Sequence, residues 1–173
     1  MTPSSFALLA GVAYLLIGVI GLVPAALVPP PPDAPPTSFA LLYGYLLGAF
    51  PVNVLHTALH IAIGFWGLCA YSGKCSAVAF ARALAILFAV LAVLGVIPGA
   101  DTLFGLMPVH GHDVPLHAVT ALVAAYFGWR VPSRARERRH SPLDRRQRSI
   151  QVAQERRFGL ADRRETLATL SPA

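Results

Sequence analysis

Residues 6–28 read FALLAGVAYLLIGVIGLVPAALV, an apolar run without a single charged side chain. About 20 apolar residues suffice to cross the hydrocarbon core of a bilayer as a helix. Inside lipid the backbone must satisfy its own hydrogen bonds, so a helix is the expected form. No lysine or arginine precedes the run, and it is longer than the apolar stretch of a signal peptide. We therefore expect a retained membrane span.

Three further apolar runs follow, at residues 54–71, 77–97 and 114–131. Each approaches the length that a membrane helix needs. Hydrophobic residues make up 55% of the 173 residues and charged residues only 13%, and the mean hydropathy is +0.60. These values exclude an ordinary soluble domain. The sequence predicts an all-α membrane protein with four transmembrane helices in residues 1–131 and a basic tail in residues 132–173.

The first connection between spans contains two unusual segments. Residues 28–38 hold six prolines, which favour a stiff, extended connector. Residues 39–50 are apolar but too short to cross the bilayer, so we expect an interfacial or re-entrant piece that ends at Pro51.

The positive charges are unevenly distributed along the chain. Residues 1–131 carry equal numbers of basic and acidic side chains, so the whole net charge of +6 lies in the tail. Lys74 and Arg82 flank the turn between the second and third spans, and Arg130 with the tail follows the fourth. The positive-inside rule then places that turn and both termini in the cytoplasm. On that reducing side we expect Cys69 and Cys75 to form no disulfide.

A sequence duplication links the two halves of the membrane region. Each half contains a span, a Gly-x-x-Pro motif, a loop, a Gly-x-x-Pro-Val motif, an Asn or Asp, a Leu-His pair and another span. The matching motifs lie at residues 21–24 and 95–98, and at residues 48–52 and 105–109. The pattern predicts two parallel helix-hairpin repeats, related by an axis along the membrane normal.

Polar side chains gather near the outer ends of the second and fourth spans. At 100° per residue, Asn53, His56 and His60 share one face of a helix, and Asp113 and His117 share a face of another. Ionisable groups that face lipid are costly, so we expect both sets to face the bundle interior at similar depth.

Several functions fit this cluster. Three imidazoles and a carboxylate, from His56, His60, Asp113 and His117, suit a zinc, copper or iron ion, with Asn53 as a hydrogen-bond partner of a ligand. The same groups suit a hydrogen-bonded lock between the two halves, a bis-histidine haem site, or a path through a small transporter. No nucleophile motif or phosphate-binding loop is present, so we expect an accessory or scaffold protein rather than an enzyme.

Certain short motifs recur in a known family. They are Gly18-Val19-Ile20-Gly21-Leu22, Asn53-x-x-His56-x-x-x-His60 with Gly64, Gly95-Val96-Ile97, and Asp113-x-x-x-His117. Over residues 6–130 the chain resembles the uncharacterised bacterial membrane proteins grouped as domain of unknown function 4383. The resemblance implies a four-helix membrane protein and supplies no activity, substrate or cofactor.

The tail repeats an acidic residue followed by two arginines at helical spacings. One interpretation is a basic amphipathic helix on anionic lipid headgroups, and the other is a solvated segment that serves as a topology signal. We do not expect nucleic acid as a partner, whereas self-association or entry into a larger membrane complex stays open. The candidate membrane-surface residues are Arg138, Arg139, Arg145, Arg146, Arg156, Arg157, Arg163 and Arg164.

Overall fold

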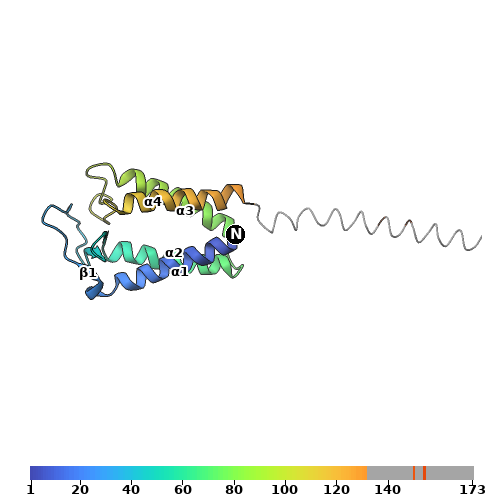
Figure 1. The fold of residues 1–173 in the computed structure, drawn as a ribbon, viewed down its shortest axis with the longest axis horizontal. Coiled ribbons are helices and arrows are strands. Elements are labelled where there is room, and N and C mark those ends of the chain that lie inside the picture. Colours follow the sequence, from blue (N-terminus) through green and yellow to red (C-terminus); the bar gives the residue numbers. More distant parts are fainter. Residues whose placement is uncertain (132–149, 151–153, 155–173) are drawn as a thin grey trace, which may run out of the picture. The chain divides into compact units, whose positions relative to one another are not determined.

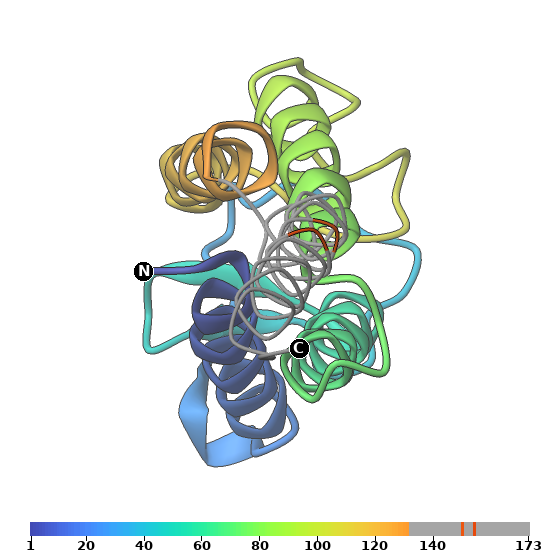
Figure 2. The same ribbon diagram turned by 90° about the vertical axis from the view of Figure 1, so that its right-hand side faces the viewer.

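The computed structural model describes residues 1–131 together with Ile150 and Gln154. Within residues 1–131 the chain forms two helical hairpins, in which α1 packs along α2 and α3 packs along α4 (Figure 1). Viewed from one end, the four helices form a bundle in which α4 lies beside α3 and on the same side as α1 (Figure 2). The helices are α1 (Pro3–Gly21), α2 (Val54–Tyr71), α3 (Ala77–Leu94) and α4 (Asp113–Ala125).

Three of these helices, α1, α2 and α3, are long and apolar enough to cross a membrane. The fourth helix, α4, is shorter at 13 residues, but a π-helical turn at Tyr126–Arg130 continues it directly. The described part of the chain is thus mostly helical, with three candidate membrane spans and a fourth helix, as expected for a helical membrane protein.

The helix ends differ from three of the four predicted spans. α1 begins three residues before the first predicted span, and the last helical stretch, residues 113–130, is shifted by one residue from the fourth. The prediction for the second span agrees with α2 at both ends. The first predicted span is too long, because α1 stops at Gly21 and Pro24 opens a short 3₁₀ turn, Pro24–Ala26. The third is also too long, because Gly95 caps α3 after Leu94. In both cases a glycine and a following proline end the helix before the apolar run ends.

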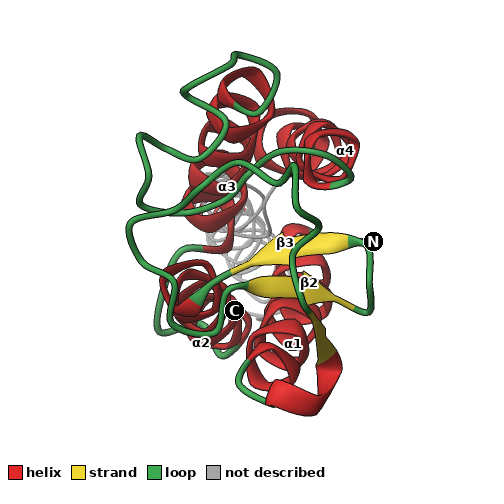
Figure 3. Ribbon diagram, turned by 90° about the vertical axis from the view of Figure 1, so that its left-hand side faces the viewer, coloured by secondary structure: helices red, strands yellow, loops and turns green. Residues whose placement is uncertain are grey.

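A small antiparallel sheet lies in the first connection, where the sequence predicted an extended connector over residues 28–38 and an interfacial or re-entrant piece over residues 39–50. The sequence did not predict these strands. Leu47 and Gly48 adopt positive φ, which reverses the apolar chain into a hairpin instead of letting it continue as a helix. The sheet lies at the end of the bundle where α2 begins (Figure 3). Its strands, in the spatial order β1-β2-β3, are β1 (Leu27–Val28), β2 (Gly44–Leu46) and β3 (Phe50–Val52).

The sequence predicted that the proline-rich connector is one extended run, and the structure shows that it is not. The Ala34 amide donates a 3.0 Å hydrogen bond to the Pro31 carbonyl, which closes a turn in the middle of it. The Ser38 amide then donates to the Gly105 carbonyl at 2.7 Å, so the segment is attached to the connection between α3 and α4. Two loops far apart in the sequence therefore meet at one end of the bundle.

Glycines set the close approach of α1 and α2. A Cβ at Gly67 would lie 2.6 Å from the Gly11 Cα and 2.7 Å from the Ala7 carbonyl oxygen. A Cβ at Gly64 would lie 2.7 Å from the Leu15 amide nitrogen. Small residues at such contacts allow backbones to pack closely in membranes, where the hydrophobic effect does not drive helices together.

The second hairpin is packed by larger side chains. Phe80, Leu84 and Phe88 on α3 are almost completely buried. Arg82 lies near the start of α3, and its Nε donates a 2.8 Å hydrogen bond to the Gly128 carbonyl inside the π-helical turn. The Arg82 guanidinium lies over the Trp129 ring. A carbonyl freed from the regular helix ladder thus receives a charged donor.

Cys69 and Cys75 form a disulfide in the structure. Our expectation of no disulfide is therefore wrong. The last turn of α2 and the short turn before α3 bring the two Cα atoms to 5.4 Å, within the range that a disulfide needs. The predicted compartment carries no information on the distance between the two cysteines, which the turn between α2 and α3 sets.

Candidate functional site

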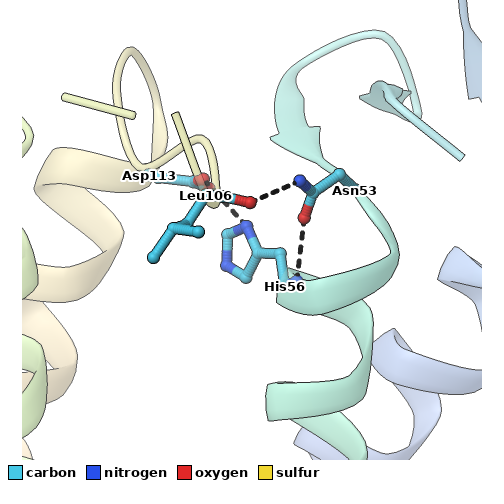
Figure 4. A network of polar contacts seen from close by, with 4 residues as sticks. All are labelled: Asn53, His56, Leu106 and Asp113. Carbon is cyan, nitrogen blue, oxygen red and sulfur yellow. Dashed lines mark hydrogen bonds and ion pairs between the residues drawn. The ribbon is translucent and has the colours of Figure 1, made fainter. Parts of the chain in front are cut away.

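Asn53 stands where the first hairpin meets the loop that precedes α4. Its side-chain oxygen accepts a 3.0 Å hydrogen bond from the His56 amide and so caps α2. Its side-chain nitrogen donates to the carbonyls of Phe39 at 3.0 Å and Leu106 at 2.8 Å. Figure 4 shows the bonds to His56 and Leu106. Asn53 is fully buried, so one side chain joins three chain segments away from the surface.

His56, Asp113 and His117 come together from the two hairpins. Each offers one ligand atom, and these atoms all lie within 4.8 Å of one another. The His56 Nδ1 is 3.9 Å from the Asp113 Oδ2 (Figure 4). All three residues are buried, at 1%, 3% and 2% exposure. The first turn of α2 and the first two turns of α4 therefore bring their polar groups to one point.

These facing atoms lack hydrogen-bond partners within the described residues. The His56 Nδ1, the Asp113 Oδ2 and the His117 Nδ1 are all buried and unpaired. A separation of 3.9 Å is too long for a hydrogen bond, so His56 and Asp113 do not form the direct pair that a lock between them requires. A buried polar atom without a partner costs about 1–3 kcal/mol. A further species bound between these atoms would remove that cost.

The backbone around His56 also matters for its chemistry. The carbonyl groups of Pro51 and Pro108 lie close to its ring. These prolines belong to the two Gly-x-x-Pro-Val motifs, so both repeated motifs deliver a carbonyl to the same imidazole. Backbone carbonyls commonly orient a metal-ligating histidine through its second ring nitrogen.

His60 lies beside this group and not within it. Its ring centroid is 4.5 Å from that of His56 and 5.4 Å from that of Tyr14. The three-residue group of ligand atoms does not include it. One helical turn separates His60 from His56, which directs it toward α1 and the Tyr14 ring.

The loop histidines lie outside the three-residue group. His112 is exposed and precedes α4, and His110 is half-buried. Partial burial lowers the pKa of His110, because a charged imidazole is harder to solvate there.

Sequence reasoning missed the partners of Asn53. They are the main-chain carbonyls of Phe39 and Leu106, and a carbonyl leaves no mark in the sequence. The Gly-x-x-Pro-Val motif that contains Leu106 was the one available signal. The tail arginines predicted to contact lipid lie outside the described residues.

Comparisons with known proteins agree with this picture. The family model described as Domain of unknown function (DUF4383) matches residues 5–130, which cover the whole helical region. No curated protein and no solved structure matches the chain. The resemblance predicted from the histidine and glycine motifs is therefore confirmed, and the chain belongs to the DUF4383 family.

Proposed function

We propose that this chain is a four-span protein of the bacterial plasma membrane with an accessory or scaffold role, whose two hairpins are joined at the outer end of the bundle. The observation that carries this proposal is the buried Asn53 side chain, which connects the start of α2 to the carbonyl of Leu106 before α4. A joint of this kind holds the two hairpins in one arrangement and presents them as a unit to other membrane proteins.

The length of the last helical stretch supports a fourth span. Residues 113–130 are helical without a break. At 1.5 Å per residue they extend about 27 Å, close to the thickness of the hydrocarbon core. Arg130, at the end of this stretch, is exposed, as expected for a charged group that reaches the interface. The two hairpins also agree with the proposed parallel repeat.

For orientation we propose that both termini face the cytoplasm, because Lys74 lies in the α2–α3 turn, Arg82 lies near the start of α3, and all other arginines follow residue 129. The arginines of the tail would then face anionic lipid headgroups of the inner leaflet. The Cys69–Cys75 disulfide favours the opposite orientation, since disulfides persist in oxidising compartments.

A pair of topology reporters decides between the two orientations. With alkaline phosphatase and green fluorescent protein fused after residue 173, we expect fluorescence and no phosphatase activity. The same reporters inserted after Gly111, in the loop before α4, should give the reverse result. Phosphatase activity of the C-terminal fusion would overturn the proposed orientation and agree with the disulfide.

A second candidate function is the binding of a transition metal ion by His56, Asp113 and His117. The observation that favours it is the set of three buried ligand atoms within 4.8 Å, which have no partner among the described residues. Two imidazoles and a carboxylate, with one position left for water or another ligand, are typical of zinc sites and suit iron and copper.

Metal analysis of the purified protein tests this candidate. After chelation and incubation with Zn²⁺ or Co²⁺, protein carrying a histidine-free tag should retain about one ion per chain. Asp113→Asn keeps the shape of the side chain but removes its charge, and His117→Ala removes an imidazole. We expect both variants to lose most of the bound metal, measured by mass spectrometry of the elements.

Two controls keep this test specific. His112→Ala removes an exposed histidine near the cluster and should leave the metal content unchanged. His60→Ala removes the neighbouring imidazole outside the three-residue group and should also retain the ion. Wild-type protein that retains no metal under these conditions would exclude the metal site and leave the structural joint as the role of the cluster.

A further inference from the structure

A cavity of about 620 Å³ lies between α1 and α4, the two helices that belong to different hairpins. It runs from Phe6 and Phe127 at one end to the β2–β3 hairpin at the other. From Phe6 to Ile17, its α1 wall spans about 16 Å at helical rise. Residues such as Leu9 and Val119 line the cavity and are also exposed on the outside of the bundle. The cavity therefore has a side that faces the lipid when α1 and α4 cross the membrane.

The wall of the cavity is apolar along most of its length and polar at one end. Apolar side chains such as Ala10, Ala13 and Val123 line the long part. Between that part and the apolar side chains of the β2–β3 hairpin, His60 and Thr120 line the cavity together with Asp113 and His117. A molecule that fills this space must combine a long apolar portion with a polar head.

Aromatic rings surround the polar end. The Tyr14 ring stacks on Phe88 with centroids 5.3 Å apart and 19° between planes. The His60 ring lies 5.4 Å from Tyr14, and the His117 ring lies 5.1 Å from Phe88. Flat conjugated rings pack well against such surfaces.

The hydrogen-bonding groups at this end are neutral or acidic. The Tyr14 hydroxyl donates to the Thr120 hydroxyl oxygen at 3.4 Å, which leaves the Thr120 hydrogen available to a ligand. His60 is 92% buried, and it lines the cavity. The described lining residues include Asp113 but no lysine or arginine. A carboxylate or phosphate head would therefore have no cation to balance it.

We propose that this cavity binds an isoprenoid quinone or its quinol, which enters from the bilayer between α1 and α4. The flat head lies at the aromatic end, where His60 and Thr120 donate hydrogen bonds to the oxygen atoms of the ring. The isoprenoid chain follows the apolar wall toward Phe6 and Phe127. Asp113 and His117 border both this cavity and the candidate metal site, so what separates the two proposals is His60, which lines the cavity but lies outside the three-residue group.

Equilibrium binding of tritiated decylubiquinone to the full chain in phosphatidylcholine nanodiscs tests the proposal. We expect saturable binding by the wild type. Ala13→Phe fills the long part of the cavity, and His60→Phe removes the donor at the head while it keeps an aromatic ring. Both variants should bind at least about tenfold more weakly, which is the effect of one lost buried contact of this kind.

The control variant is Val12→Phe, because Val12 is exposed on α1 but does not line the cavity. It adds the same ring one residue away and should bind like the wild type. The metal content of Ala13→Phe should also match that of the wild type, which separates this test from that of the metal site. The proposal is overturned if the wild type shows no saturable binding, or if Ala13→Phe binds normally. It is equally overturned if palmitate displaces the quinone at equal concentration, because the cavity would then select the chain and not the head.

Discussion

Asn53→Asp is expected to destabilise the protein by about 3 kcal/mol or more. The aspartate keeps the oxygen that accepts the His56 amide, so the cap of α2 survives. It lacks the NH₂ group that donates to the carbonyls of Phe39 and Leu106, and it places a carboxylate against two buried acceptors. Each unsatisfied carbonyl costs about 1–3 kcal/mol, and the repulsion adds to that cost. The measurement is reversible unfolding in detergent micelles, followed by circular dichroism.

The matched control is Ser76→Ala at the start of α3. Ser76 also caps a helix, through a 3.2 Å bond from the Ala79 amide, but it is exposed and joins no other segment. Loss of this cap should cost about 1 kcal/mol. If Asn53→Asp costs no more than Ser76→Ala, the Asn53 side chain is a cap alone and the joint between the hairpins is not what holds them.

Gly67→Leu is expected to separate α1 from α2. The first atom of the new side chain would lie 2.6 Å from the Gly11 Cα and 2.7 Å from the Ala7 carbonyl oxygen, and both are backbone atoms that cannot rotate away. Overpacking of a well-packed contact costs about 1–3 kcal/mol of stability. Because this clash is with backbone atoms, we expect a loss of about 3 kcal/mol or more. We expect a clear fall in the thermal midpoint in detergent and loss of decylubiquinone binding, because α1 forms one wall of the cavity.

Ala62→Leu provides the comparison for this variant. Ala62 lies on the same helix but is exposed, so leucine there adds the same apolar bulk to the surface that lipid or detergent covers. It should leave the free energy of unfolding within about 0.5 kcal/mol of the wild-type value, with little change in the thermal midpoint. Equal stability of Gly67→Leu and Ala62→Leu would contradict the close packing of α1 on α2.

The local pattern of the sequence was sufficient for the helices and for the faces that they bury. The apolar run at residues 54–71 predicts α2 at both ends, since hydrophobic length and a capping asparagine are local properties. The shared face of Asn53, His56 and His60 likewise follows from helical periodicity, and all three residues are buried.

The connections could not be predicted in the same way. Hydrophobicity alone does not separate an interfacial helix from a short sheet, and residues 44–52 became a hairpin because Leu47 and Gly48 take positive φ. The Cys69–Cys75 disulfide depends on how the end of α2 meets the turn before α3, which a charge argument does not contain.

The sequence by itself determined that this protein is a set of apolar helices with polar groups at one depth, because helix formation in lipid is fixed by length, composition and period. Only the tertiary structure decided what those polar groups face. Asn53 donates hydrogen bonds to main-chain carbonyls, and the His60 ring lies beside Tyr14. His56 lies close to Asp113 and His117, which belong to the other hairpin. The physical reason is that these contacts depend on the distance and rotation between helices. Glycine contacts and loop hydrogen bonds set that distance and rotation, and their partners lie far apart in the chain.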